Sequence, residues 1–193
     1  GPSCSGKTTL GRALTRILPR CSLINQDNFY KPDSEIPVDP ATGLDNWDTP
    51  DALDFPRFIA AIEEASAREK PDLLSALKAH ASNAHLPTPP TEQLTQGAIM
   101  DDDAVDDQLI DELRLQYASA LAGHRFVVVD GFLLFTHPEI VSRLDVRIFV
   151  TASRETLKRR RESRVGYITV EGFWQDPPGY FDRIVWPNFV LHH

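Results

Sequence analysis

The hydrophobic residues of this chain first repeat with the period of a helix. Over 10–18, apolar side chains recur three and four positions apart, and Pro19 ends the pattern. The same spacing returns over 58–65, and again over 109–121 before Gly123, a residue type that commonly follows a helix. The pattern therefore predicts three amphipathic helices, each with one face turned toward a core.

Three short runs carry apolar residues without a helical period. Residues 21–25 (CSLIN), 126–130 (FVVVD) and 145–150 (DVRIFV) have the length and residue types of buried strands. Because these runs alternate with the helices, they predict an α/β fold with a parallel sheet and helices on both faces. Ligands bind such sheets at the C-terminal ends of the strands, so residues that follow each run are the first site candidates.

The chain opens with GPSCSGKTTL, which has the G-x-x-x-x-G-K-T spacing of a phosphate-binding loop. Backbone N–H groups of residues 2–8 would surround a β-phosphate, Lys7 would reach the β- and γ-phosphates, and Thr8 would bind Mg²⁺. A chance glycine-rich turn is the alternative, but an amphipathic helix follows at once. The predicted ATP-binding residues of the loop are Gly1, Ser3, Ser5, Gly6, Lys7, Thr8 and Thr9.

This loop makes the expected fold a three-layer phosphate-loop NTPase fold. Such a loop normally follows a buried strand, and no residue precedes Gly1 in the sequence, so the first strand is expected to be missing from this chain. A Pro/Thr/Gln-rich stretch at about 70–105 has no hydrophobic period. We expect it to be a flexible surface insertion in a single kinase domain that spans residues 1–193.

The composition narrows the range of partners and compartments. The formal net charge of −8 argues against a long basic face for polynucleotide, and no apolar run approaches membrane-spanning length. The two cysteines, Cys4 and Cys21, are too few for a disulfide framework, which favours reduced thiols. We therefore expect small-molecule partners and a cytoplasmic location, with the nucleus as a second compartment.

Two acidic residues lie where predicted strands end. Asp130 ends the run at 126–130, where a carboxylate can hold Mg²⁺; a helix cap or a turn is the alternative. Asp27 lies just past 21–25, where it could accept the proton of a substrate hydroxyl; an Asx-turn is the alternative.

A basic segment follows the last predicted strand. Residues 154–164 (RETLKRRRESR) hold six basic and two acidic side chains in a chain that is acidic overall. Lys158, Arg161 and Arg164 fall on one stripe of the predicted helix, so they could converge on a phosphate. A solvated helix face is the alternative.

Five sequence segments occur in a characteristic order along the chain: INQDNFYKPDSEIPVD, NWDTPDALDF, VVVDGFLLF, LKRRRESR and DPPGYFD. Together they resemble the nicotinamide riboside kinases, most closely the fungal ones, within the uridine kinase-like phosphate-loop kinases. The likeness covers nearly the whole chain except 70–105. It implies ATP-dependent phosphorylation of the ribose 5′-hydroxyl of nicotinamide riboside, with Mg²⁺, and acceptance of nicotinic acid riboside.

The resemblance also implies roles for acceptor-site residues. Asp27 matches the catalytic base, and Asn28 stands where some relatives have a second aspartate. Asp48 and Arg161 match the pair that binds the ribose 2′- and 3′-hydroxyls. Trp47 and Tyr167 match the aromatic pair around the pyridine ring, although the segment around Tyr167 is longer here than in animal relatives.

On the donor side, the resemblance assigns ATP and Mg²⁺ to Lys7, Thr8 and Asp130, with Lys7 also taking part in catalysis. Arg160 and Arg164 match arginines of a lid over about 154–182 that would contact ATP. Lid closure would exclude water from the transferred phosphate.

Two other functions remain open at this point. A uridine or cytidine kinase would use the same chemistry on a pyrimidine nucleoside. A truncated, non-catalytic fragment that binds nucleotide weakly would follow from the missing first strand. The word NWD favours a cationic planar base, but only weakly.

Overall fold

The centre of the structure, a computed structural model that describes residues 1–67, 105–169 and 171–193, is a pair of parallel strands. β1 (Cys21–Asn25) and β2 (Phe126–Asp130) pair in register from Cys21 opposite Phe126 to Asn25 opposite Asp130. Both strands were predicted. Their parallel pairing brings the polar residues at their C-terminal ends to one edge of the sheet.

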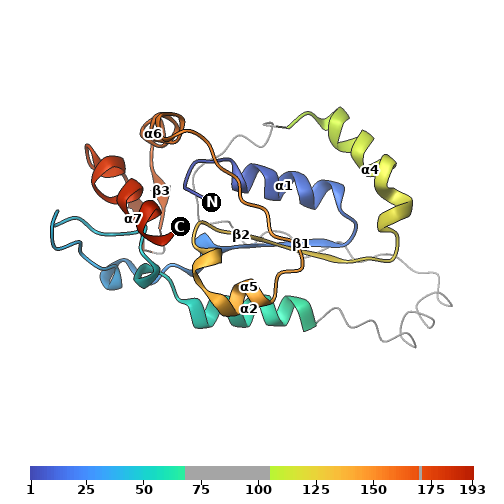
Figure 1. Cartoon of the computed structure of the whole chain (residues 1–193), viewed down its shortest axis with the longest axis horizontal. Helices are drawn as coiled ribbons and strands as arrows, with labels where there is room; N and C mark the ends of the chain where they lie inside the picture. Colours follow the sequence, from blue (N-terminus) through green and yellow to red (C-terminus); the bar gives the residue numbers. More distant parts are fainter. Residues whose placement is uncertain (68–104, 170) are drawn as a thin grey trace.

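Helices lie on both faces of this strand pair, as expected for an α/β fold. α1 (Lys7–Ile17) packs on one side, and α2 (Phe55–Ala67) and α5 (Pro138–Ser142) lie on the other (Figure 1). α4 (Asp107–Leu121) runs beside α1. The three predicted amphipathic helices are confirmed as α1, α2 and α4.

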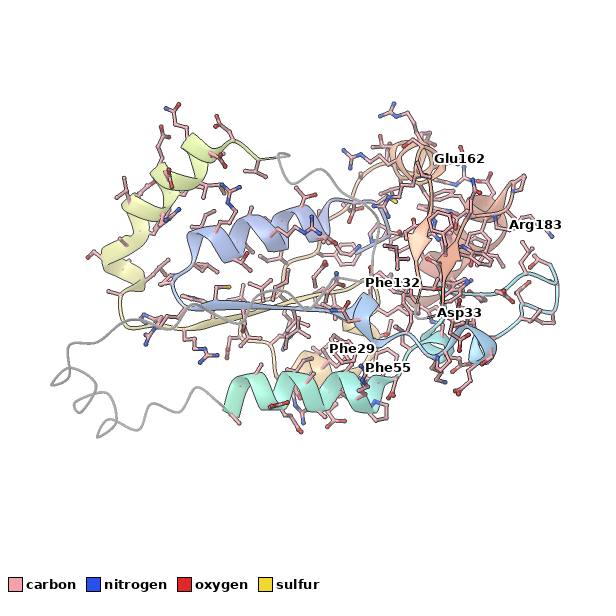
Figure 2. The ribbon with its side chains drawn as sticks, turned by 180° about the vertical axis from the view of Figure 1, so that it is seen from behind. Phe29, Asp33, Phe55, Phe132, Glu162 and Arg183 are labelled. Carbon is pink, nitrogen blue, oxygen red and sulfur yellow. The ribbon has the colours of Figure 1, made fainter. Side chains whose placement is uncertain are left out.

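The core under the sheet is aromatic and aliphatic. Phe29 follows β1, and Figure 2 shows it on the side of the sheet where Phe55 begins α2. Its ring lies 4.9 Å from that of Phe58, and both rings belong to one buried cluster that includes Ile62 and Ile140. These contacts hold α2 and α5 against the residues that follow β1.

The predicted strand at 145–150 is wrong. In the described ranges no strand lies beside this segment, and a strand without a neighbour leaves its backbone N–H and C=O groups unpaired. Val146 and Ile148 are instead 77% and 56% exposed. They line an apolar groove whose opposite wall is β2 and α1.

A second, smaller unit covers the C-terminal edge of the sheet. It consists of α6 (Arg154–Glu162), the antiparallel hairpin β3 (Tyr167–Ile168) and β4 (Phe173–Trp174), a π-helix (Phe181–Val185) and α7 (Trp186–His192). Short 3-10 turns complete the described elements: Gln26–Phe29, Asp33–Glu35, Pro50–Ala52 and Leu134–Thr136. In the core of this C-terminal unit, Leu157 of α6 packs against Tyr180, Phe181 and Ile184.

The expected insertion at 70–105 falls almost wholly on residues 68–104, which lie outside the described residues. Among the helices that the structure describes, none combines the length and the apolar character needed to cross a membrane.

The two strand ends are joined by a buried glutamine. Gln26 has no exposed surface, and its Oε1 accepts the N–H of Leu133 at 3.0 Å. Gly131 lies against this side chain: a Cβ on Gly131 would stand 2.6 Å from Gln26 Oε1 and 2.7 Å from Gln26 Cβ. Glycine is therefore required where β2 passes into the loop beyond it.

We expect Gly131→Ala to lower the free energy of unfolding by about 1–3 kcal/mol, because the added methyl group overlaps atoms that cannot rotate away. Urea unfolding followed by circular dichroism measures the change. Gly172→Ala is the matched control, since its Cβ would have no neighbour within 4 Å. Equal unfolding midpoints for the two variants would contradict this account.

Candidate active site

A cavity of about 100 Å³ lies where the phosphate loop, the ends of β1 and β2, α6 and the β3–β4 hairpin meet. Ten of the residues singled out from the sequence line it: Ser3, Lys7, Thr8, Asp27, Trp47, Asp48, Asp130, Arg161, Arg164 and Tyr167. These residues come from distant parts of the chain, so the cavity exists only in the folded protein. A separate groove between α1, α4 and α6 is lined by four other predicted residues: Ser5, Gly6, Thr9 and Arg160. Gly1 lies against Val150 instead.

The loop at 1–6 has the backbone of an anion-binding site. Cys4 and Gly6 have positive φ angles of 64° and 98°, and α1 begins directly afterwards at Lys7. Such alternation turns successive N–H groups toward one point, and the helix adds the positive end of its dipole. Lys7 Nζ donates to Pro2 O at 2.6 Å, so the ammonium group is held against the loop.

Thr8 and Asp130 meet at the bottom of the cavity. Thr8 Oγ1 donates to Asp130 Oδ2 at 2.7 Å, which joins the first turn of α1 to the end of β2. A hydroxyl and a carboxylate at this separation suit Mg²⁺, which takes few protein ligands and completes its shell with phosphate oxygens and water. The described residues hold no group of three or more His, Cys, Asp or Glu that could bind a metal by itself. The donor set fits a magnesium ion brought in with a phosphate ligand.

Asp27 stands in the short turn after β1. Asn25 Oδ1 accepts the Asp27 N–H at 2.9 Å, so Asn25, not Asp27, supplies the Asx-turn side chain. Burial raises the pKa of Asp27 to about 6, and the nearby charge of Asp130 adds to the increase. Burial likewise lowers the pKa of Lys7, although Asp130 and Asp27 oppose that change. A carboxyl group whose pKa is about 6 can exchange a proton near neutral pH.

Arg161 is the most connected side chain of the site and is 6% exposed. Its Nε donates to Asp176 Oδ2 at 2.6 Å, and its Nη1 donates to Ser3 Oγ at 3.0 Å. The contact with Asp48, the partner expected from the sequence, is longer at 3.4 Å. Burial raises the pKa of Asp48, an effect that the charge of Arg161 opposes. Arg161 therefore joins the phosphate loop to two carboxylates.

Other basic residues of the segment 154–164 differ in what they contact. Arg160 Nη1 donates to Cys4 O at 3.2 Å, and Arg164 Nη1 donates to Tyr167 Oη at 3.0 Å, so both face the loop or the cavity. Lys158 instead forms an ion pair with Asp182 and does not line the cavity. Of the stripe predicted to converge on a phosphate, Arg161 and Arg164 line the cavity and Lys158 does not.

Aromatic side chains form much of the cavity wall. Trp47 is 7% exposed, and its ring contacts Tyr30 at 5.4 Å and Trp174 at 5.6 Å. Tyr30, Phe132, Trp174 and Asp176 were not identified from the sequence as site residues. The segment DPPGYFD contains Asp176, but nothing in that segment shows that its carboxylate pairs with the buried Arg161.

No protein-family profile matches the chain. Among curated proteins, it is similar to nicotinamide riboside kinase of Schizosaccharomyces pombe, with 36% identity over all of this chain and 76% of that protein. The nicotinamide riboside kinase of Saccharomyces cerevisiae is also 36% identical, over all of this chain and 75% of its own length. Nicotinamide riboside kinase 1 of Homo sapiens is 30% identical over all of this chain and 73% of its length.

We expect Asp27→Asn to stabilise the fold at pH 8. The folded-state pKa is raised, so the ionised carboxylate lowers stability fully above about pH 6, and this cost disappears only well below the ordinary pKa of 3.8, where the carboxyl group is protonated in both states. Because Asp27 is partly exposed, we expect a gain of about 1–2 kcal/mol, measured as a rise in Tm. The gain should shrink as the pH falls from about 6 to 4 and vanish at about pH 3.

Asp145→Asn, which removes an exposed carboxylate, is the control for the loss of one negative charge. A Tm at pH 8 that is equal in the two variants would show that burial of Asp27 does not destabilise the protein.

Proposed function

The chain belongs to the nicotinamide riboside kinase family, and from that premise we propose that it transfers the γ-phosphoryl group of ATP to the ribose 5′-hydroxyl of nicotinamide riboside, giving nicotinamide mononucleotide. The observation that carries the proposal is the convergence, in one cavity, of the phosphate loop, Asp27 and the Asp48–Arg161 pair. Relatives at 36% identity over the whole chain support the same reaction. We propose with it the three-layer phosphate-loop fold of such kinases.

The donor half of the proposed reaction is electrostatic. Loop N–H groups and Lys7 bind the phosphates, while Arg160 approaches from α6 and Arg164 from just beyond its end. Thr8 and Asp130 would hold a magnesium ion, which would supply further neutralisation of the phosphate charge. Fixed positive charge around the transferred group lowers the barrier because it needs little reorganisation during the reaction.

The acceptor half depends on carboxylates and aromatic rings. Asp48 accepts hydrogen bonds from the ribose hydroxyls while Arg161 donates to them, which suits a vicinal diol. Trp47 presents an aromatic face to the cationic pyridine ring, and Tyr167 also lines the cavity. Asp27 then lies in the same cavity as Lys7 and accepts the proton of the 5′-hydroxyl as the phosphoryl group arrives.

The uridine kinase alternative differs only in the acceptor. We expect the protein, given ATP, Mg²⁺ and equal concentrations of nicotinamide riboside and uridine, to form nicotinamide mononucleotide first. Chromatographic separation of the two monophosphates measures the ratio. Faster formation of uridine monophosphate would overturn the proposed acceptor, and absence of both products would favour the non-catalytic alternative. With nicotinic acid riboside as a third acceptor, the same assay compares a carboxylate on the pyridine ring with the carboxamide of nicotinamide riboside.

We expect Asp27→Asn to lower kcat by ~10²-fold or more while leaving ATP binding intact, because the amide cannot accept the hydroxyl proton. In the unsubstituted protein, kcat/KM for the riboside should fall as pH decreases through about 6, because Asp27 becomes protonated. The variant should lack this dependence. Turnover close to normal in Asp27→Asn, with the pH profile retained, would remove Asp27 from its role as base.

A further inference from the structure

The β3–β4 hairpin forms the side of the cavity that neither the sheet nor the phosphate loop reaches. Ile168, Thr169 and Trp174 line the cavity, and none of them was expected there from the sequence. Thr169 Oγ1 donates to Asp33 Oδ2 at 2.8 Å, which fastens the hairpin to the loop that follows Tyr30. Figure 2 shows Asp33 beside the end of the hairpin. The hairpin is thus attached at its tip and is a built wall of the cavity.

Trp174 is held by the group that also holds Arg161. Its Nε1 donates to Asp176 Oδ1 at 2.9 Å, and the second oxygen of that carboxylate accepts from Arg161 Nε at 2.6 Å. The position of the indole is therefore set relative to the arginine that is proposed to bind the ribose. An N–H that donates to a carboxylate also makes the indole ring more electron-rich, which strengthens its attraction for a cation.

Of the two aromatic residues of the hairpin that line the cavity, Trp174 and not Tyr167 has its ring in contact with Trp47. The two indoles have centroids 5.6 Å apart at 49°, and Trp174 also contacts Tyr180 at 5.6 Å. The Tyr167 ring instead has the guanidinium groups of Arg161 and Arg164 at 5.1 Å and 5.3 Å from its centroid. A face used by guanidinium groups offers little to a second cation.

The geometry of the two indoles determines how a base can bind. Aromatic rings in direct contact have centroids about 4.5–7 Å apart, so rings at 5.6 Å leave no space for a base between them. We call Trp47 and Trp174 the aromatic corner. A planar base would therefore have to pack against the side of this corner that opens into the cavity, which Asp48 also lines.

We propose that Trp174 is a specificity-determining residue, which with Trp47 selects a planar, positively charged base over a neutral one. The proposal rests on the proposed function, because it concerns the acceptor of the same reaction. A pyridinium ring gains the cation–π attraction of both indoles, whereas a neutral uracil gains stacking alone. Tryptophan is the side chain with the strongest attraction of this kind.

The test compares Trp174→Phe and Trp174→Leu with the unsubstituted protein. We expect Trp174→Leu to raise KM for nicotinamide riboside by about 5–30-fold, the size of a desolvated cation–π contact, with a smaller increase for Trp174→Phe. KM for ATP and KM for uridine should change by less than about twofold. The ratio of kcat/KM for the two nucleosides should therefore shift toward uridine.

Phe173→Leu is the matched control, because Phe173 is the preceding residue of the same strand, is 58% exposed and does not line the cavity. If the role of Trp174 were merely structural, Trp174→Leu would weaken the binding of ATP and of both nucleosides together and would lower the Tm. An unchanged nucleoside ratio in Trp174→Leu, in a variant whose Tm and KM for ATP are normal, overturns the proposal.

Failure of the proposed function has a different signature. If the unsubstituted protein phosphorylates uridine better than nicotinamide riboside, the proposed acceptor is wrong. Calorimetric binding of each nucleoside without ATP then tests the aromatic corner separately. Weaker binding of nicotinamide riboside but not of uridine to Trp174→Leu supports the role of Trp174, and equal loss for both nucleosides rejects it.

Discussion

The buried guanidinium of Arg161 is the interaction on which the rest of the site depends. Removing a charge from water costs several kcal/mol unless hydrogen bonds and opposite charges replace the lost hydration. Here Asp176, Asp48 and Ser3 replace it, and they come from the segment after the hairpin, the loop before α2 and the phosphate loop. The need to satisfy one cation therefore holds three distant segments together around the cavity.

The charged groups that are buried at the strand ends lower the stability of the folded state. Asp27, Asp130 and Lys7 lie together at the ends of β1 and β2, where burial raises the pKa of Asp27 and lowers that of Lys7. Both shifts disfavour the charged forms that phosphoryl transfer requires. Active sites commonly keep such destabilising electrostatics because catalysis requires them. Stability and the proposed chemistry thus make opposite demands on Asp27.

The helices and strands that were predicted correctly from the sequence are those whose hydrophobic pattern lies within the element itself. The apolar runs that became β1 and β2 and the periodic stretches that became α1, α2 and α4 carry their own signals. The segment 145–150 has a comparable apolar run, yet it forms no strand, because a strand also requires a neighbour to pair with its backbone. Local pattern cannot report whether that neighbour is present.

The residues of the candidate site also fall into two groups: those that a local motif predicts and those that tertiary contacts determine. Lys7, Thr8 and Asp27 follow from a motif and from the position of a strand end, and the structure places all three in the cavity. Asp176 and Trp174 depend on the register of a two-residue hairpin and on the partners of Arg161, which no spacing in the sequence reveals. The residues that are proposed to hold phosphate could be predicted from the sequence because a short loop arranges them. The residues that shape the acceptor wall are set by tertiary contacts, and only the folded structure identifies them.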